Sequence, residues 1–151
     1  MMRPLLTSAV LLICAVQSAS AGAQLTGSKT AAGCIALRGA STTITAEGRL
    51  TLQHLPGPPN FESIRQGDED RLTLILVLPE TVCIDDGGDF ADPNERFKTV
   101  HVWSLDPLIH RKLRQSVGRI VRIGGDGYAS NNALHYAPLV LEAKTVGARQ
   151  R

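Results

Sequence analysis

Residues 43–53 alternate almost strictly between apolar and polar side chains, and this pattern constrains the fold more than any other feature of the chain. Because successive side chains of a strand point to opposite faces, the alternation predicts a half-buried strand of an antiparallel sheet. Gly48 falls on the inner face and predicts a bulge or a sharp bend, as small barrels need. The other predicted inward-facing residues are Ile44, Ala46, Leu50 and Leu52.

The rest of the chain carries four more strand-like segments. Residues 71–78 are apolar on both faces, which is typical of a central strand, and residues 81–84 are predicted to extend it past Pro79. Proline, glycine and acidic residues separate the segments, as expected for loops and turns. The other predicted strands are residues 97–105, 119–125 and 134–146, and the predicted loops are residues 55–70, 85–95 and 125–132.

One helix is predicted between the third and fourth strands. Asp106 followed by Pro107 is typical of an N-cap and a first helical turn, so residues 108–117 are interpreted as a helix. The i, i+4, i+8 spacing predicts that its buried stripe consists of Ile109, Leu113 and Val117. The basic residues off this stripe are interpreted as a solvated helix side: His110, Arg111, Lys112 and Arg114.

The order of these elements is β-β-β-α-β-β, which favours a mainly β fold. A small five-stranded Greek-key barrel of the OB (oligonucleotide/oligosaccharide-binding) type, with one helix between strands three and four, fits this order and the length of the chain. Another small, partly open barrel or an α+β sandwich is the alternative, because the sequence does not reveal the order of strands in space.

The first 23 residues have the features of a removable export signal. Arg3 precedes an apolar stretch, and small residues then provide cleavage sites before Gly22 or, as we prefer, before Gln24. The apolar stretch is shorter than the ~20 residues of a spanning helix, so an uncleaved anchor is disfavoured. We therefore expect a periplasmic or secreted bacterial protein without a membrane span. The predicted parts are a signal (1–23), a flexible lead-in (24–33), one domain (34–146) and a tail (147–151).

The full chain has 3 cysteines, and cleavage of the signal removes Cys14. The remaining pair, Cys34 and Cys83, is most simply explained by a disulfide bond, because the protein is expected in an oxidising compartment. Two buried thiols or a metal site are the alternatives, although no CxxC spacing supports a metal.

Three segments resemble an uncharacterised bacterial exported family, domain of unknown function 4431. They are residues 56–68, with the sequence PGPPNFESIRQGD, residues 76–83 and residues 118–141, and the resemblance covers roughly residues 34–146. Phe61 stands where this family usually has tyrosine, and His135-Tyr136 stands where two histidines are usual. The resemblance implies export and a barrel-like fold, and it implies no reaction.

The proline-rich loop is one candidate binding surface. Its prolines preset the backbone and can hold neighbouring side chains in fixed positions at little entropic cost. The candidate contact residues are Asn60, Phe61 and Glu62. The alternative is a structural lid in which Phe61 and Ile64 pack over one end of the barrel.

The second candidate surface is one side of the barrel, where OB domains often bind ligands. We predict that this side carries His101, Trp103, His135 and Tyr136. The alternative is that the histidines are separately satisfied or exposed. No metal or cofactor is predicted, because the chain has no HExxH or comparable spacing.

Composition limits the classes of function. The chain has 16 basic and 14 acidic residues, so it lacks the basic excess typical of nucleic-acid binders, and aromatic residues that could stack on bases make up only 4% of it. We therefore expect no nucleic-acid partner. The chain lacks the common nucleophile, phosphate-loop and zinc motifs. The sequence therefore favours a non-catalytic exported module that binds an unknown protein or small ligand. The alternatives are a small extracytoplasmic hydrolase or nuclease, which would use histidines and a carboxylate, and a neutralising partner of an exported enzyme.

Overall fold

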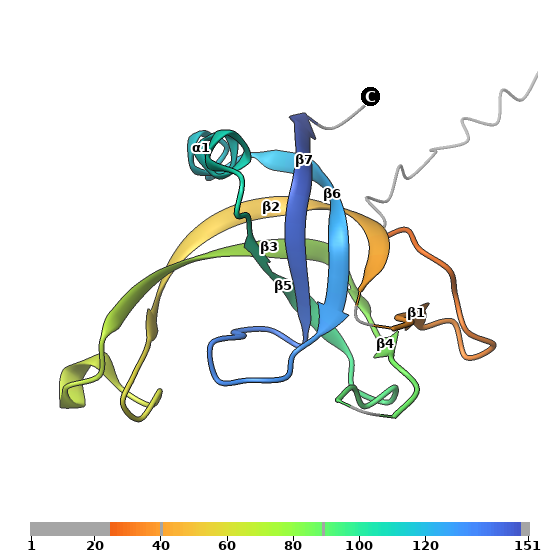
Figure 1. Cartoon of the computed structure of the whole chain (residues 1–151), viewed down its shortest axis with the longest axis horizontal. Helices are drawn as coiled ribbons and strands as arrows, with labels where there is room; N and C mark the ends of the chain where they lie inside the picture. Colours follow the sequence, from red (N-terminus) through yellow and green to blue (C-terminus); the bar gives the residue numbers. More distant parts are fainter. Residues whose placement is uncertain (1–24, 40, 89, 149–151) are drawn as a thin grey trace, which may run out of the picture.

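The structure is a computed structural model, and it describes residues 25–39, 41–88 and 90–148 (Figure 1). The predicted export signal, residues 1–23, lies outside the described residues. Residues 149–151 of the predicted tail lie outside them as well.

The described chain is mainly β, with a single α-helix that follows the strands β1 to β5. This confirms the predicted fold class at the level of a mainly β protein with a five-stranded sheet and a helix before its last two strands. The elements are β1 (Ile35–Ala36), β2 (Thr42–Pro56), η1 (Ile64–Gln66), β3 (Asp70–Val82), β4 (Ile84–Asp85), β5 (Phe97–Trp103), α1 (Pro107–Gln115), β6 (Ile120–Ala129) and β7 (Leu139–Ala148).

The five long strands lie in the order β2-β3-β5-β7-β6, and β6 returns to β2, so that the sheet closes on itself. Strands β5 and β7 are parallel, and all other neighbours in this sheet are antiparallel. Strand β2 belongs to both sides of the closure, because residues 42–49 pair with β6 and residues 49–56 pair with β3. Figure 1 shows β2 and β3 as long curved strands that arch across the other three.

Gly48 lies where β2 leaves β6 and joins β3. A Cβ atom at this position would collide with the carbonyl oxygen of Val77. The glycine therefore permits the close approach of β2 and β3 at this point.

The core lies inside the closed sheet. Ile44, Ala46 and Leu50 of β2 are buried as predicted, and Leu52 is partly buried against the same core. Strand β5 contributes Val100 and Val102. Inward-facing residues thus alternate with outward-facing ones along both strands, which leaves the outer face of β5 free to carry other side chains.

Helix α1 packs on one end of the closed sheet (Figure 1). The Asp106 carboxylate accepts hydrogen bonds from the backbone N–H groups of Leu108 and Ile109, at 2.7 and 3.3 Å. Such a cap contributes about 1 kcal/mol of helix stability. Leu113 is fully buried, and Ile109 and Val117 pack against the core, which confirms the predicted stripe.

The boundaries of the last two strands differ from the prediction. Strand β6 continues to Ala129 through the glycine-rich segment that we interpreted as a turn, and β7 begins only at Leu139. In this segment Gly127 is buried inside the sheet, where a Cβ atom would collide with the Ile44 side chain. The glycine is required by close packing rather than by a turn, and a turn propensity cannot distinguish the two. Residues 130–138 form a loop.

Cys34 and Cys83 form a disulfide bond, which confirms that prediction. The bond lies beside the parallel pair β1–β4 and joins the N-terminal segment to the end of β3. At the start of residues 25–33, predicted as a flexible lead-in, Leu25 is only 6% exposed and the Thr26 N–H donates to the Thr45 carbonyl at 2.8 Å, whereas residues 31–33 are exposed. The apolar side chain of Leu25 and the edge of β2 explain the docking of this first part.

The β2–β3 hairpin extends beyond the closed sheet. Pairing of β3 with β5 starts at Leu74, so that residues 70–73 of β3 pair only with β2 among the named strands. We call residues 53–73 the arm, and Figure 1 shows it projecting to one side of the closed sheet. No helix among the described residues is long and apolar enough to cross a membrane.

Candidate functional site

Strand pairing places one row of side chains across the outer face of the sheet. Ile75 of β3 pairs with His101 of β5, His101 pairs with Val140 of β7, and Val140 pairs with Tyr128 of β6. Directly paired residues project from the same face of a sheet. His101 and Tyr128 therefore share the outer face, while Val100 and Val102 point into the core.

The loop of residues 130–138 brings further rings to this row. The His101 ring lies 6.3 Å from the His135 ring and 5.7 Å from the Tyr136 ring, and the Tyr128 and His135 rings are 5.4 Å apart, all in edge-to-face arrangements. The Trp103 indole N–H donates to the Tyr128 hydroxyl at 2.9 Å. We call this group the aromatic cluster: His101, Trp103, Tyr128, His135 and Tyr136.

Hydrogen bonds fix the loop in this position. The Asn131 N–H donates to Nδ1 of His135 at 3.1 Å, and the Ser130 N–H donates to the Pro138 carbonyl at 2.9 Å. The Tyr136 hydroxyl donates to the Pro56 carbonyl at 3.1 Å. The last bond ties the loop to the arm, so that the two segments form one structure.

The cluster is uncharged at neutral pH. Burial, with the neighbouring His135 as a smaller cause, lowers the pKa of His101 from 6.5 to about 4. Burial also lowers the pKa of His135 and raises the pKa of Tyr128 and of Tyr136. Nδ1 of His101 is buried and has no hydrogen-bond partner among the described residues. These rings therefore offer apolar faces and neutral hydrogen-bonding groups.

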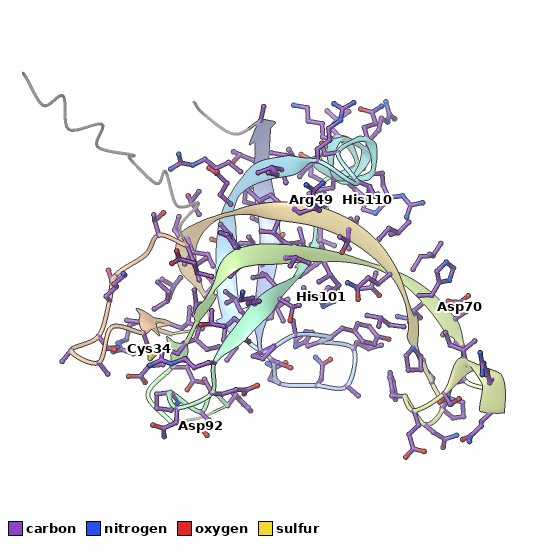
Figure 2. The ribbon with its side chains drawn as sticks, turned by 180° about the vertical axis from the view of Figure 1, so that it is seen from behind. Cys34, Arg49, Asp70, Asp92, His101 and His110 are labelled. Atoms are coloured by element: carbon purple, nitrogen blue, oxygen red, sulfur yellow. A yellow bond between two sulfur atoms is a disulfide. The ribbon has the colours of Figure 1, made fainter. Side chains whose placement is uncertain are left out.

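A cleft of about 450 Å³ adjoins the cluster. It lies between the first half of β3, the end of β5, α1 and the 130–138 loop, and Figure 2 shows Asp70, His101 and His110 on three of these elements. The lining comes from four separate parts of the chain: residues 69–74, residues 101–104, His110 with Arg114, and Leu134 with Tyr136.

The acidic groups of the cleft already have partners. Asp70 binds Nδ1 of His54 at 2.8 Å, and Glu69 accepts from Nε of Arg71 at 3.1 Å. In contrast, the Arg114 side chain makes no hydrogen bond or ion pair with the described residues. Arg114 thus brings to the cleft a positive charge that has no partner among the described residues, although the sequence pattern indicated only a solvated helix side there.

The tip of the arm is organised by Asp68, whose role the sequence analysis missed. Its carboxylate accepts from the backbone N–H groups of Asn60, Glu62 and Ser63 at 2.9, 2.8 and 2.8 Å. These bonds, led by the one from Ser63, lower the pKa of Asp68. Phe61 is half-buried with a φ of 61°, a left-handed backbone that the surrounding bonds must hold. The Asp68 bonds therefore hold the backbone of the tip in place.

The predicted site residues fall into two groups. His101, Trp103, His135 and Tyr136 come together as predicted, although His135 and Tyr136 lie on a loop and not on a strand. Asn60, Phe61 and Glu62 do not join them, because the cleft is lined by the base of the arm, residues 69–74, and not by its tip. The lid alternative is not met either, since Ile64 is exposed and the tip lies to the side of the closed sheet (Figure 1).

Tyr128 was missed for a different reason. It follows the Gly-Asp-Gly segment that resembles a turn, so its place on an outer strand face was not predicted. Buried and half-buried residues alternate through β6, as in a strand. The glycines have no side chains to display this alternation in the sequence.

The hydrolase hypothesis would gain support if His101, His135 and a carboxylate lay within hydrogen-bonding reach of one another. Among the described residues, neither carboxylate of the cleft bonds to these histidines, because Asp70 binds His54 and Glu69 binds Arg71. No group of three or more His, Cys, Asp or Glu side chains in the described ranges is arranged to hold a metal ion. The geometry gives this hypothesis no specific support.

Comparison with known proteins adds no relative: no protein-family model, curated protein or solved structure matches this chain.

Proposed function

We propose that this protein is an exported binding module of the OB type that takes its ligand in the cleft beside the aromatic cluster. The strand order supports the OB assignment. The sheet strands run β2-β3-β5-β7-β6, with β5 and β7 parallel and the helix between the third and fourth of them in sequence. A Greek-key barrel of the OB type has five strands closed in this manner.

The position of the cleft carries the proposal. OB domains bind ligands on the face of their second and third strands, between the loop that joins strands one and two and the loop that joins strands four and five. Here these elements are β3, β5, the arm and the 130–138 loop. All four of them line the cleft or contact its lining.

Export is the second part of the proposal. It rests on the signal-like sequence of residues 1–23 and on the resemblance to an exported bacterial family. The disulfide bond between Cys34 and Cys83 is consistent with it, because such bonds persist in oxidising compartments outside the cytoplasm.

Trp103 makes the proposal testable, since it is the only tryptophan of the chain and it lines the cleft. We would titrate the purified protein with hexapeptides of defined sequence, chito- and cello-oligosaccharides, and a ten-residue oligothymidine, and record tryptophan emission. At least one of the first two probe sets is expected to change the emission saturably.

Variants then locate the binding. Arg114→Ala and Leu134→Ala are expected to weaken it, while Glu62→Ala at the tip of the arm is the matched control that leaves it unchanged. The proposal is wrong if no probe changes Trp103 emission at millimolar concentration. It is also wrong if Glu62→Ala abolishes binding and the two cleft variants do not.

A further inference from the structure

Where β3 borders the cleft, the edge of the strand lines it in addition to its face. Six consecutive residues of the chain, 69–74, line it. Alternate residues of a strand point to opposite faces, so a cleft on one face would be lined by every second residue. Consecutive residues line a cleft when the backbone itself borders it.

The hydrogen-bond alternation shows which backbone groups face the cleft. The Gly57 N–H donates to the Glu69 carbonyl at 2.7 Å, so residue 69 directs its polar groups toward β2. In antiparallel strands these directions alternate, and Leu72 therefore directs its N–H and C=O away from β2. The same alternation is seen on β2. Leu50 lies opposite Leu76 of β3, but its N–H donates to the Arg119 carbonyl and its C=O accepts from the Gly118 N–H, so its polar groups point away from β3.

Leu72 has no strand neighbour on that side. The pairing of β3 with β5 begins at Leu74, and β5 ends at Trp103. No hydrogen bond joins the Leu72 backbone to a loop or a side chain of the described residues. The edge of β3 is thus open where it borders the cleft, and an unpaired edge is a template for another strand.

The other walls of the cleft indicate the composition of the added strand. Leu72 and Leu134 are 51% and 43% exposed and provide apolar contact area. His110 and Arg114, four residues apart on α1, lie on one side of the helix and line the same cleft. The Arg114 side chain has no ion-pair partner among the described residues, and its positive charge favours an acidic partner at that wall of the cleft.

We propose that the cleft binds an extended acidic peptide segment of a partner protein, which adds as a strand to the open edge of β3. This inference rests on the proposed function and names its ligand class. The main chain of the peptide would bond to the N–H and C=O groups of Leu72. One of its carboxylates would reach Arg114. An open edge of residues 70–73 accommodates a segment of about four to six residues, at roughly 3.4 Å per residue.

The test uses an acetylated and amidated hexapeptide of alternating valine and glutamate, with binding followed by Trp103 emission. Three altered peptides accompany it: one with lysine in place of every glutamate, and two that are N-methylated at alternate residues, in the two possible registers. N-methylation removes the amide donors from one edge of the peptide only.

The lysine peptide is expected to bind at least about fivefold more weakly than the glutamate peptide, as for a partly exposed ion pair. One N-methylated peptide is expected to lose binding by about tenfold or more, and the other to retain it, because strand addition uses one peptide edge. Arg114→Gln is expected to reduce the preference for glutamate. The matched control is Arg111→Gln on the same helix, which does not line the cleft.

Two results would overturn the inference: equal binding of both N-methylated peptides and the parent peptide, or an unchanged preference for glutamate in Arg114→Gln. If oligosaccharides bind in the cleft and peptides do not, the proposed function stands and the peptide inference fails. If neither probe set binds, both fail.

Discussion

Removal of the Cys34–Cys83 disulfide is expected to lower the free energy of unfolding by about 4 kcal/mol. The bond joins residues that are 49 apart in sequence. Opening a loop of this length returns conformational entropy to the unfolded chain worth about 4 kcal/mol in the chain-entropy model. Because domains of this size are stable by about 5–15 kcal/mol in total, the loss is a large share.

Noncovalent contacts are expected to keep the reduced protein folded. Leu25, Ile35 and Leu37 of the N-terminal segment are buried in the core, and the backbone hydrogen bonds between β1 and the segment that contains β4 do not involve the sulfur atoms. The cysteines themselves are buried, so alanine is the appropriate replacement, since it introduces no polar group into their site.

The assay is urea unfolding of Cys34→Ala/Cys83→Ala, compared with the wild-type protein with and without reductant. In thermal unfolding of the same proteins, the melting temperature of the variant is expected to be lower than that of the oxidised wild type by roughly 10–20 °C. The urea m-value should rise, because an unfolded chain without the cross-link exposes more surface. A loss below about 1 kcal/mol would refute the loop-entropy reasoning. A difference above about 2 kcal/mol between reduced wild type and variant would show that packing of the sulfur atoms dominates.

Three further predictions concern protonation and packing. Because the folded chain protonates His101 only at about pH 4 and a free histidine does so at about 6.5, the free energy of unfolding should fall as the pH drops from 6.5 toward 4. His101→Phe should reduce this slope, and the exposed-site control His110→Gln should not. Gly48→Ala should destabilise by about 1–3 kcal/mol, because its Cβ meets the Val77 carbonyl, while Gly147→Ala, with no atom within 4 Å of its Cβ, should change stability by less than about 0.5 kcal/mol. Asp68→Ala should speed amide hydrogen exchange at residues 60–63, because it removes the acceptor of three backbone N–H groups. In the wild-type protein, acid should speed exchange at these residues only below the usual carboxyl pKa, because the pKa of Asp68 is lowered.

Each of these predictions has a contrary outcome. If the free energy of unfolding falls equally with pH in His101→Phe and in the wild-type protein, His101 is not the group whose lowered pKa causes the fall. Equal stability of the two glycine variants would mean that β2 and β3 can separate at the bend without cost. Unchanged exchange in Asp68→Ala would show that the prolines alone hold the tip.

The strands and the helix that were predicted correctly have local signals. The alternation of residues 43–53 fixes the inward face of β2 wherever its partners lie, and Asp106-Pro107 starts α1 by contacts within the same turn. The disulfide followed from the number of cysteines left after cleavage. In contrast, the end of β6 depends on the contact between Gly127 and Ile44, which are far apart in sequence, and a glycine-rich segment is ambiguous without that contact.

The candidate site was predictable only in part, for the same reason. His101 and Trp103 share a face because they are two residues apart on one strand. Tyr136 reaches them only because the 130–138 loop folds back and bonds to Pro56, a residue 80 positions away. Arg114 lines the cleft because of how α1 sits on the sheet. The prolines predicted a preformed arm tip, but they carry no information on where the arm points.

The open edge beside the cleft is a liability that closure of the sheet removes from most of its strand length. In the closed sheet each of the five strands has a neighbour on both sides, and closure of this kind removes edges that would otherwise recruit other chains. The arm overhangs the closed sheet on both of its strands: among the named strands, residues 53–56 of β2 pair only with β3, and residues 70–73 of β3 pair only with β2. The β3 part of this overhang borders the cleft. Leu72, half-exposed on that overhang, increases the hazard. The 130–138 loop is bonded to the arm through Tyr136 and the arm tip is bonded through Asp68, so the overhang is held in place beside the cleft. If the edge of β3 binds another strand, we expect that edge to be held in place and to have a cation such as Arg114 across the cleft. An overhang without a binding role would need neither the bonds that hold it nor the cation.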